Sequence, residues 1–190
     1  MKDRKLLGIE MGRLTPDQYK ARPQSGLVVV LDNVRSAHNV GSAFRSADAF
    51  GVDRLVLCGI SAVPPSAEIH KSALGAEDAV PWEHADDTLS AVERLRAEGY
   101  TPVAVEQTVH SRKLGAWDRP AGQRLALIFG NEVSGVQQAV VDACDFSLEI
   151  PQQGTKHSLN VSVSVGVVLW ELVRGTSLCD GPAAAPGAPG

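Results

Sequence analysis

Two short segments made only of apolar residues place the strongest limit on the fold of this chain. They are Leu27–Leu31 (LVVVL) and Leu125–Phe129 (LALIF). Side chains of a strand point alternately to its two faces, so both faces of each segment must be covered. A parallel sheet with helices on both sides provides this cover. The two segments therefore predict buried strands of a mainly parallel sheet.

Helical and strand patterns alternate through the rest of the chain. Leu89, Val92 and Leu95 form a stripe within Asp86–Glu98, which predicts a helix with these three residues facing inward. Further helices are predicted at 15–21, at 67–74 and in a short segment that ends near Ala143. Another is predicted from the apolar stripe between Val40 and Phe50, which follows a polar loop at 32–41. The other predicted strands are 54–58, 101–106 and 146–150. We therefore predict an α/β fold with a mainly parallel sheet and helices on both faces.

The stretch Ile150–Leu172 is compatible with two structures. Val161–Val165 alternates with period two, as a strand does. However, the segment continues to Arg174 without a turn signal, and Ser158 could cap the start of a helix. We predict a buried helix lined with small residues, preceded by a loop that could fold around a ligand. The alternative is an ordinary core element with a solvated loop.

Composition favours one soluble domain in a reducing cytoplasm. The 190 residues are enough for a core, and no apolar run approaches the roughly 20 residues of a membrane span. The first residues lack the apolar region of a signal peptide. Cys58, Cys144 and Cys179 are odd in number and lack metal-ligand spacing, and the five histidines show no HExxH pairing. We predict no metal site and no membrane association.

The charge distribution is uneven. A net charge of −4 argues weakly against nucleic-acid binding, which usually needs a basic surface. Much of the acid lies between Glu77 and Glu98, whereas residues 1–25 are rich in lysine and arginine. A basic face is therefore compatible with the acidic total. We divide the chain into an N-terminal lead-in (1–25), one domain (26–175) and a disordered tail rich in Gly, Pro and Ala (176–190).

Three polar loops follow predicted strands, at Asp32–Arg45, Phe129–Gly135 and Ile150–Asn160. Ligands of open parallel sheets bind beyond the carboxyl ends of the strands, so three converging loops predict one site. None of the loops contains a GxGxxG or GxxxxGK[ST] phosphate motif. Ser134 does not form a nucleophile elbow, because Glu132 stands where that motif requires glycine.

Taken together, these loops resemble a known family. The patterns are Asn39-x-Gly41-x-x-x-Arg45, Gly130-Asn-Glu132-x-x-Gly135 and Ile150-Pro…Ser158-Leu-Asn160. In order and separation they resemble the three signature motifs of the SpoU (TrmH-like) branch of the SPOUT superfamily, over about Gly26 to Arg174. Asn131 and Val133 vary within the second motif, and residues 155–157 lie in a variable loop.

The resemblance implies an RNA ribose 2′-O-methyltransferase that uses S-adenosylmethionine and acts on tRNA or rRNA. It also implies a SPOUT methyltransferase fold with a C-terminal trefoil knot, and a homodimer with the active site near the subunit interface. The lead-in would then be an RNA-contacting arm. Two other functions stay open: methylation of a base nitrogen, and a non-catalytic dimer that binds RNA or the cofactor.

The resemblance also assigns roles to individual residues. Arg45 matches the catalytic arginine, which would hold the phosphate next to the target ribose. The residues that would orient Arg45 and the ribose are Asn39, Glu132, Ser158 and Asn160. The residues that match the cofactor pocket are Gly130, Ile150 and Leu159, with Glu106 and Gln107 as a further wall.

Each of these residues also has a purely structural interpretation. Arg45 could be a surface arginine paired with Asp48 on the same helix. Glu132 could be a carboxylate at a helix N-terminus, and Asn160 a helix cap. Trp170 is expected in the core or at a dimer interface.

Overall fold

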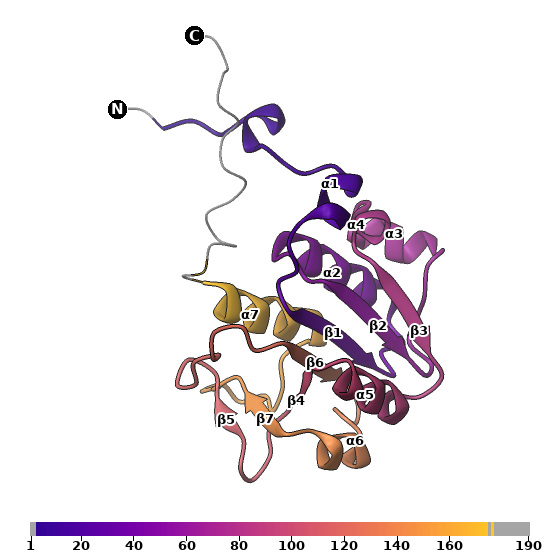
Figure 1. Cartoon of the computed structure of the whole chain (residues 1–190), viewed down its shortest axis with the longest axis vertical. Helices are drawn as coiled ribbons and strands as arrows, with labels where there is room; N and C mark the ends of the chain where they lie inside the picture. The colour runs from indigo at the N-terminus through magenta and orange to yellow at the C-terminus, as the bar shows by residue number, and fades with distance from the viewer. Residues whose placement is uncertain (1–2, 175, 177–190) are drawn as a thin grey trace.

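The computed structural model describes residues 3–174 and 176. A seven-stranded sheet forms its centre, in the order β3-β2-β1-β6-β4-β7-β5, and every neighbouring pair is parallel. The strands are β1 (Leu27–Asp32), β2 (Arg54–Cys58), β3 (Trp82–Ala85), β4 (Thr101–Val105), β5 (Arg112–Lys113), β6 (Leu125–Gly130) and β7 (Phe146–Glu149). The predicted parallel sheet is confirmed, and its two apolar segments, β1 and β6, pair side by side at its centre (Figure 1).

Helices cover both faces of this sheet. They are α1 (Pro16–Ala21), α2 (Ala37–Ala49), α3 (Ala67–Ala73), α4 (Ala76–Ala79), α5 (Thr88–Ala97), α6 (Gln138–Ala143) and α7 (Val161–Val173), with a 3-10 turn at Gly8–Met11. Val29 and Leu31 of β1 belong to the core cluster that contains α2, α3, α4 and α7. Val28 and Val30 belong to the opposite cluster with α5 and α6. The alternation of a strand thus supplies two cores from one apolar segment.

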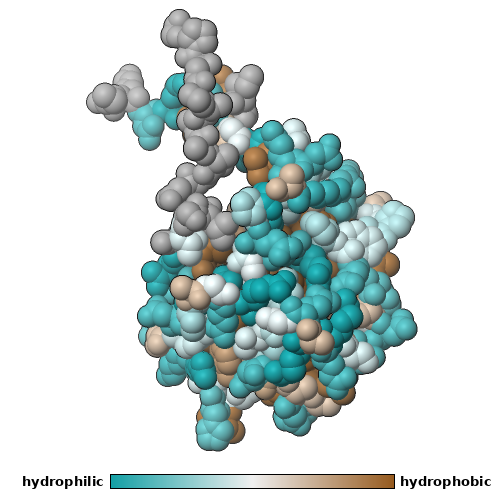
Figure 2. All heavy atoms as spheres, in the orientation of Figure 1, coloured by the Kyte–Doolittle hydropathy of each residue, from teal (hydrophilic) through white to brown (hydrophobic). Residues whose placement is uncertain are grey.

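The outer surface agrees with this burial. The face in Figure 2 is mainly hydrophilic, with apolar side chains in small scattered groups. No helix within residues 3–174 is long and apolar enough to cross a membrane.

The chain order brings four loops to one edge of the sheet. After β3 at one end of the sheet, α5 leads to β4 on the other side of β1, and β6 then lies between β1 and β4 (Figure 1). Because all strands are parallel, the segments that follow β1, β4, β6 and β7 leave from the same edge. Three of these segments contain the motifs singled out in the sequence.

The structure corrects several sequence expectations away from the motifs. The edge strand β3 was not predicted, because its side chains are partly exposed and include Glu83 and His84. Leu89 does not face inward: its side chain is 37% exposed, and Ala91 is buried beside Val92 and Leu95. The short strand β5, at the other end of the sheet, was also not predicted.

Two helix starts also differ from expectation. α2 begins at Ala37, within the segment predicted as loop, because the Ser36 side chain accepts a hydrogen bond from the Asn39 N–H and caps the helix. The predicted C-terminal helix is confirmed as α7, but Asn160 rather than Ser158 caps it. Trp170 is 54% exposed, so it does not lie in the core. The predicted tail, apart from Thr176, lies outside the described residues.

Candidate cofactor pocket and catalytic network

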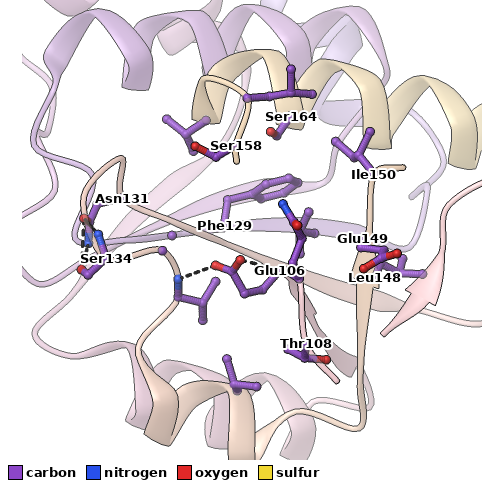
Figure 3. Close-up of a pocket in the computed structure, with 18 of the residues that line it drawn as sticks. Glu106, Thr108, Phe129, Asn131, Ser134, Leu148, Glu149, Ile150, Ser158 and Ser164 are labelled. Atoms are coloured by element: carbon purple, nitrogen blue, oxygen red, sulfur yellow. Dashed lines mark hydrogen bonds between the residues drawn. The ribbon is translucent and has the colours of Figure 1, made fainter. Parts of the chain in front are cut away.

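A cavity of about 740 Å³ opens at the carboxyl ends of β4, β6 and β7. All five residues predicted for the cofactor pocket line it. They are Glu106, Gln107, Gly130, Ile150 and Leu159. Glu132 and Ser158 also line the cavity. Figure 3 shows Ser158 and Ser164 on the side of α7, with Phe129 of β6 and Glu106 of the β4 loop across from them. The second and third sequence motifs therefore share one cavity with the loop after β4.

The loop after β6 is a tight turn held by its own polar groups. The Asn131 side-chain oxygen accepts hydrogen bonds from the N–H groups of Val133 and Ser134, each at 3.0 Å. The Gly135 N–H donates to the Asn131 carbonyl at 3.0 Å, which closes the turn. An asparagine that satisfies local backbone donors is typical of such turns. The geometry of this motif is therefore fixed largely by main-chain contacts.

Gly130 is required by the way this loop folds back. A Cβ atom at residue 130 would overlap the backbone of Gly135 and Val136. The resemblance places Gly130 in the cofactor pocket. The structure shows that this glycine also allows the protein's own loop to fold back closely.

Glu106 holds the same loop from the β4 side. Its Oε2 accepts a hydrogen bond from the Val136 N–H at 3.0 Å, and its Oε1 accepts one from Gln107 N–H at 2.9 Å (Figure 3). Gln107 in turn donates from Nε2 to the His157 carbonyl at 2.6 Å. The two wall residues thus tie the β4 loop to the loops after β6 and β7.

A chain of side-chain hydrogen bonds joins all three motifs. The Asn160 Nδ2 group donates to Asn39 Oδ1 at 3.2 Å, and Asn39 Nδ2 donates to Glu132 Oε1. Asn39 is only 8% exposed, so its amide is held on both sides away from most of the solvent. Asn160 also caps α7, since its Oδ1 accepts from the Ser162 N–H at 2.9 Å. The capping role and the network role therefore coexist in one side chain.

Glu132 lies in the loop before α6, and it is not at the N-terminus of that helix, which begins at Gln138. Its carboxylate is placed by Asn39 instead. The purely structural interpretation of Glu132 as a helix-dipole carboxylate is therefore wrong.

Arg45 lies on α2, about two turns beyond Asn39, and is exposed. It forms no ion pair with Asp48, and it makes no side-chain hydrogen bond to any residue that the structure describes. It lines a second cavity, of about 500 Å³, rather than the first. The structure therefore brings Asn39, Glu132 and Asn160 together but leaves Arg45 to one side of them.

The family model described as the SpoU rRNA methylase family matches residues 26–170. The chain belongs to this family. Relatives include the 23S rRNA (guanosine-2'-O-)-methyltransferases RlmB of Nitrosomonas europaea and Vibrio cholerae. They are 36% and 33% identical over 83% of this chain. The chain spans 60% and 63% of the length of these relatives.

Solved structures of similar proteins agree with the family. An AdoMet-bound rRNA methyltransferase from Sinorhizobium meliloti has a TM-score of 0.74 and 30% identity, over 80% of this chain and 57% of that one. The A. aeolicus TrmH/SpoU tRNA modifying enzyme has a TM-score of 0.72 and 29% identity, over 84% of this chain and 81% of that one. The seven-stranded sheet is thus the SpoU fold, covered by helices on both faces.

Ser158 takes no part in the hydrogen-bonded network of this SpoU family member. Its side chain is exposed, lines the first cavity and makes no hydrogen bond to the described part of the chain. Within that same part, no group of three or more His, Cys, Asp or Glu residues is arranged to hold a metal ion.

One residue that supports the SpoU site was missed in the sequence. Asp32, at the end of β1, is fully buried and accepts hydrogen bonds from the Thr88 hydroxyl at 2.6 Å and from the Gln137 N–H at 2.9 Å. It therefore fixes the end of the loop that contains Glu132. The available signal was a carboxylate directly after five apolar residues, a position where burial demands hydrogen-bond partners.

Proposed function

We propose that this chain is an S-adenosylmethionine-dependent methyltransferase that modifies a ribose 2′-OH of tRNA or rRNA. The observation that carries the proposal is the Asn160–Asn39–Glu132 chain, which joins the three family motifs beside a cavity of ligand size. The relatives named for guanosine 2′-O-methylation support the same reaction.

The first cavity fits the cofactor in size and chemistry. Small-molecule sites are typically about 300–1,000 Å³, mostly apolar, with a few placed polar groups. Here Phe129, Ile150 and Leu159 supply apolar walls, and Glu106 and Ser158 supply polar atoms. S-adenosylmethionine, when bound, supplies a methyl group on a positively charged sulfur. The protein's part is to hold the nucleoside with loop backbone, and the interlocked loops keep that backbone in place.

The catalytic residues act by position. Arg45 presents a planar, permanently charged group suited to a phosphate next to the target ribose. Asn39, Glu132, Ser158 and Asn160 orient that ribose relative to the first cavity. Holding reacting groups in the correct geometry contributes several kcal/mol to a rate enhancement, so positioning is a sufficient role for these side chains.

A homodimer is part of the proposal. Val163, Val167 and Trp170 are exposed on α7 at spacings of four and three residues, which places them on one apolar face. We infer that a second copy covers this face and that the active site lies near the interface. We expect Trp170→Glu to shift the chain to monomer in sedimentation velocity. An unchanged dimer would place the interface elsewhere.

Three further features belong to the family-based proposal. The C-terminal segment, ending in α7, forms a trefoil knot, and the protein works in the cytoplasm, which suits the unpaired Cys58 and Cys144. The lead-in acts as an RNA arm, because residues 3–7 and 10–14 are exposed and include Lys5 and Arg13. Deletion of residues 1–14 should therefore weaken RNA binding more than it weakens cofactor binding. Equal RNA affinity would exclude the arm.

Substitution of Arg45 tests the mechanism. Arg45→Ala should fold and bind S-adenosylmethionine, but lose methyl transfer by at least about 100-fold in single-turnover assays with labelled cofactor. Arg45→Lys keeps the charge without the planar group, so it should restore RNA affinity better than rate. The control is Arg96→Ala, which removes an exposed arginine of α5 on the other face of the sheet. Wild-type transfer by Arg45→Ala would refute the proposed role.

Analysis of the product RNA separates the candidate functions. After incubation with labelled cofactor, nuclease digestion should place the label on a ribose 2′-oxygen. Label on a base nitrogen would assign the protein to base methylation. Cofactor and RNA binding without any transfer would indicate the non-catalytic dimer.

A further inference from the structure

The second cavity lies between α2 and α3 and is lined largely by hydrogen-bond donors. Its polar lining consists of His38, Ser42, Arg45 and Ser46 on α2, and Lys71 and Ser72 on α3. The acidic residues of these two helices, Asp48 and Glu68, are not among the lining residues. The cavity is therefore a cationic cleft without a carboxylate in its wall.

Five of the six polar side chains of this cleft lack partners among the described residues, and the sixth, Ser72, donates to the Glu68 and Ile69 carbonyls. His38, Arg45 and Lys71 are exposed, and none makes an ion pair or hydrogen bond with the described residues. The half-buried hydroxyls of Ser42 and Ser46 also donate to no described group. In contrast, Arg22, Arg54 and Arg94 elsewhere on the protein are paired with carboxylates. The cleft thus gathers free donors that require an external acceptor.

The two helices that form the cleft are locked together. Gly41 packs so tightly on α3 that a Cβ atom there would overlap the Ser72 hydroxyl and the Ile69 carbonyl. Lys71 is the residue before Ser72, so its backbone has a fixed position relative to Arg45. Lys71 lies outside the three family motifs, so the resemblance assigned it no role.

The length of the cleft suits an extended ligand. From His38 to Ser46 the donors span 8 steps along α2, or about 12 Å at 1.5 Å per residue. His38 lies next to Asn39, so one end of the cleft adjoins the hydrogen-bonded network. A strip of donors of this length that starts at the network suits a stretch of phosphodiester backbone better than a single anion.

We propose that the α2–α3 cleft holds the RNA backbone that flanks the target ribose, with Lys71 and His38 as phosphate contacts beside Arg45. This inference rests on the proposed function and adds a substrate-positioning surface to it. Contacts of this kind fix the register of a nucleic acid and strengthen binding without reading its sequence. Lys71 therefore serves affinity, while Arg45 serves the reaction.

Lys71→Ala tests the inference, with Lys113→Ala as the matched control on the distant edge strand β5. Binding of total tRNA should be measured by filter retention over a range of salt. We expect Lys71→Ala to weaken binding about tenfold at low salt. The slope of log affinity against log salt concentration should become shallower by about one, because one phosphate contact is lost. Cofactor affinity and the single-turnover rate at saturating RNA should stay within about twofold, and Lys113→Ala should match wild type.

The outcomes distinguish this inference from the proposed function. Unchanged tRNA affinity and salt slope in both Lys71→Ala and Lys71→Gln would overturn the cleft assignment, whatever the wild-type activity. A wild-type chain that binds tRNA but transfers no methyl group would overturn the proposed reaction, and the binding comparison would still test the cleft. A shift of Lys71→Ala to monomer in sedimentation would instead assign the cleft to the contact between two copies.

Discussion

Gly130 is a small residue whose replacement should have a large effect. The loop after β6 returns so closely that the backbone of Gly135 and Val136 occupies the space of a side chain. The same loop supplies Glu132 to the network and lines the first cavity. A substitution here acts on the first cavity through the loop.

We expect Gly130→Ala to destabilise the protein by about 1–3 kcal/mol and to weaken S-adenosylmethionine binding at least tenfold, because the loop must move outward. Gly154→Ala is the matched control, since a Cβ atom at residue 154 meets nothing within 4 Å. Urea unfolding and calorimetry measure the two effects. Equal cofactor affinity in the two variants would show that the loop position does not control the pocket.

The residues of the site were predicted unequally well from sequence. Asn39, Glu132 and Asn160 were found because each belongs to a motif of fixed spacing. Their mutual hydrogen bonds were not predictable, since Asn39 and Asn160 are 121 residues apart. The placement of Arg45 in a separate cavity depends on how α2 packs against α3, which helical periodicity does not reveal.

At the scale of elements, Asp32 joins three parts of the fold. Its carboxylate accepts hydrogen bonds from Asn33 at the end of β1, from Thr88 of α5, and from both the backbone and side chain of Gln137 before α6. In every one of these hydrogen bonds the partner is the donor and the buried Asp32 carboxylate is the acceptor. Asp32 therefore couples the central strand to the loop of the second motif.

We expect Asp32→Asn to lower the free energy of unfolding by about 2–3 kcal/mol, because the new amide group would face donors and leave one of them unsatisfied. The control is Asp142→Asn on α6, whose exposed carboxylate accepts one bond from Gln138. That change should stay within about 0.5 kcal/mol. Urea midpoints compare the two variants, and identical midpoints would contradict the coupling.

The elements themselves were predictable where burial is simple. β1 and β6 are buried on both faces, so apolar runs identify them. β3 was missed because it is an edge strand with partly exposed polar side chains. In α5 the short Ala91 is buried instead of Leu89, a choice that the sheet makes and that helical periodicity alone does not reveal.

At the scale of the whole molecule, several buried groups make the stability of the fold decrease as the pH becomes alkaline. Burial raises the pKa of the Tyr19 hydroxyl to about 12 and the pKa of each thiol of Cys58 and Cys144 to about 12. The unfolded chain loses these protons earlier, near pH 9.0 for the thiols and 10.0 for tyrosine. The unfolded state is therefore favoured as the pH rises from about 9 to about 12.

We expect these groups to leave the urea midpoint unchanged below pH 9 and to lower it at higher pH. The loss of stability from Cys58 alone should be on the order of 1 kcal/mol by pH 10. Tyr19→Phe should lower stability at pH 7, because the hydroxyl donates to the Ala47 and Val52 carbonyls. The same variant should show a shallower decline above pH 10. A decline as steep as that of wild type would exclude Tyr19 as a source.

The position of Asn160 has a consequence for how the protein is made. A ribosome finishes all seven strands by Glu149, so the sheet can begin to assemble while the last segment is still absent. Asn39, synthesised more than a hundred residues earlier, receives its Asn160 partner only when the final helix arrives. We expect a nascent chain to be folded in outline yet inactive. The hydrogen-bonded network that joins the three motifs is thus completed only after residue 160 has been made.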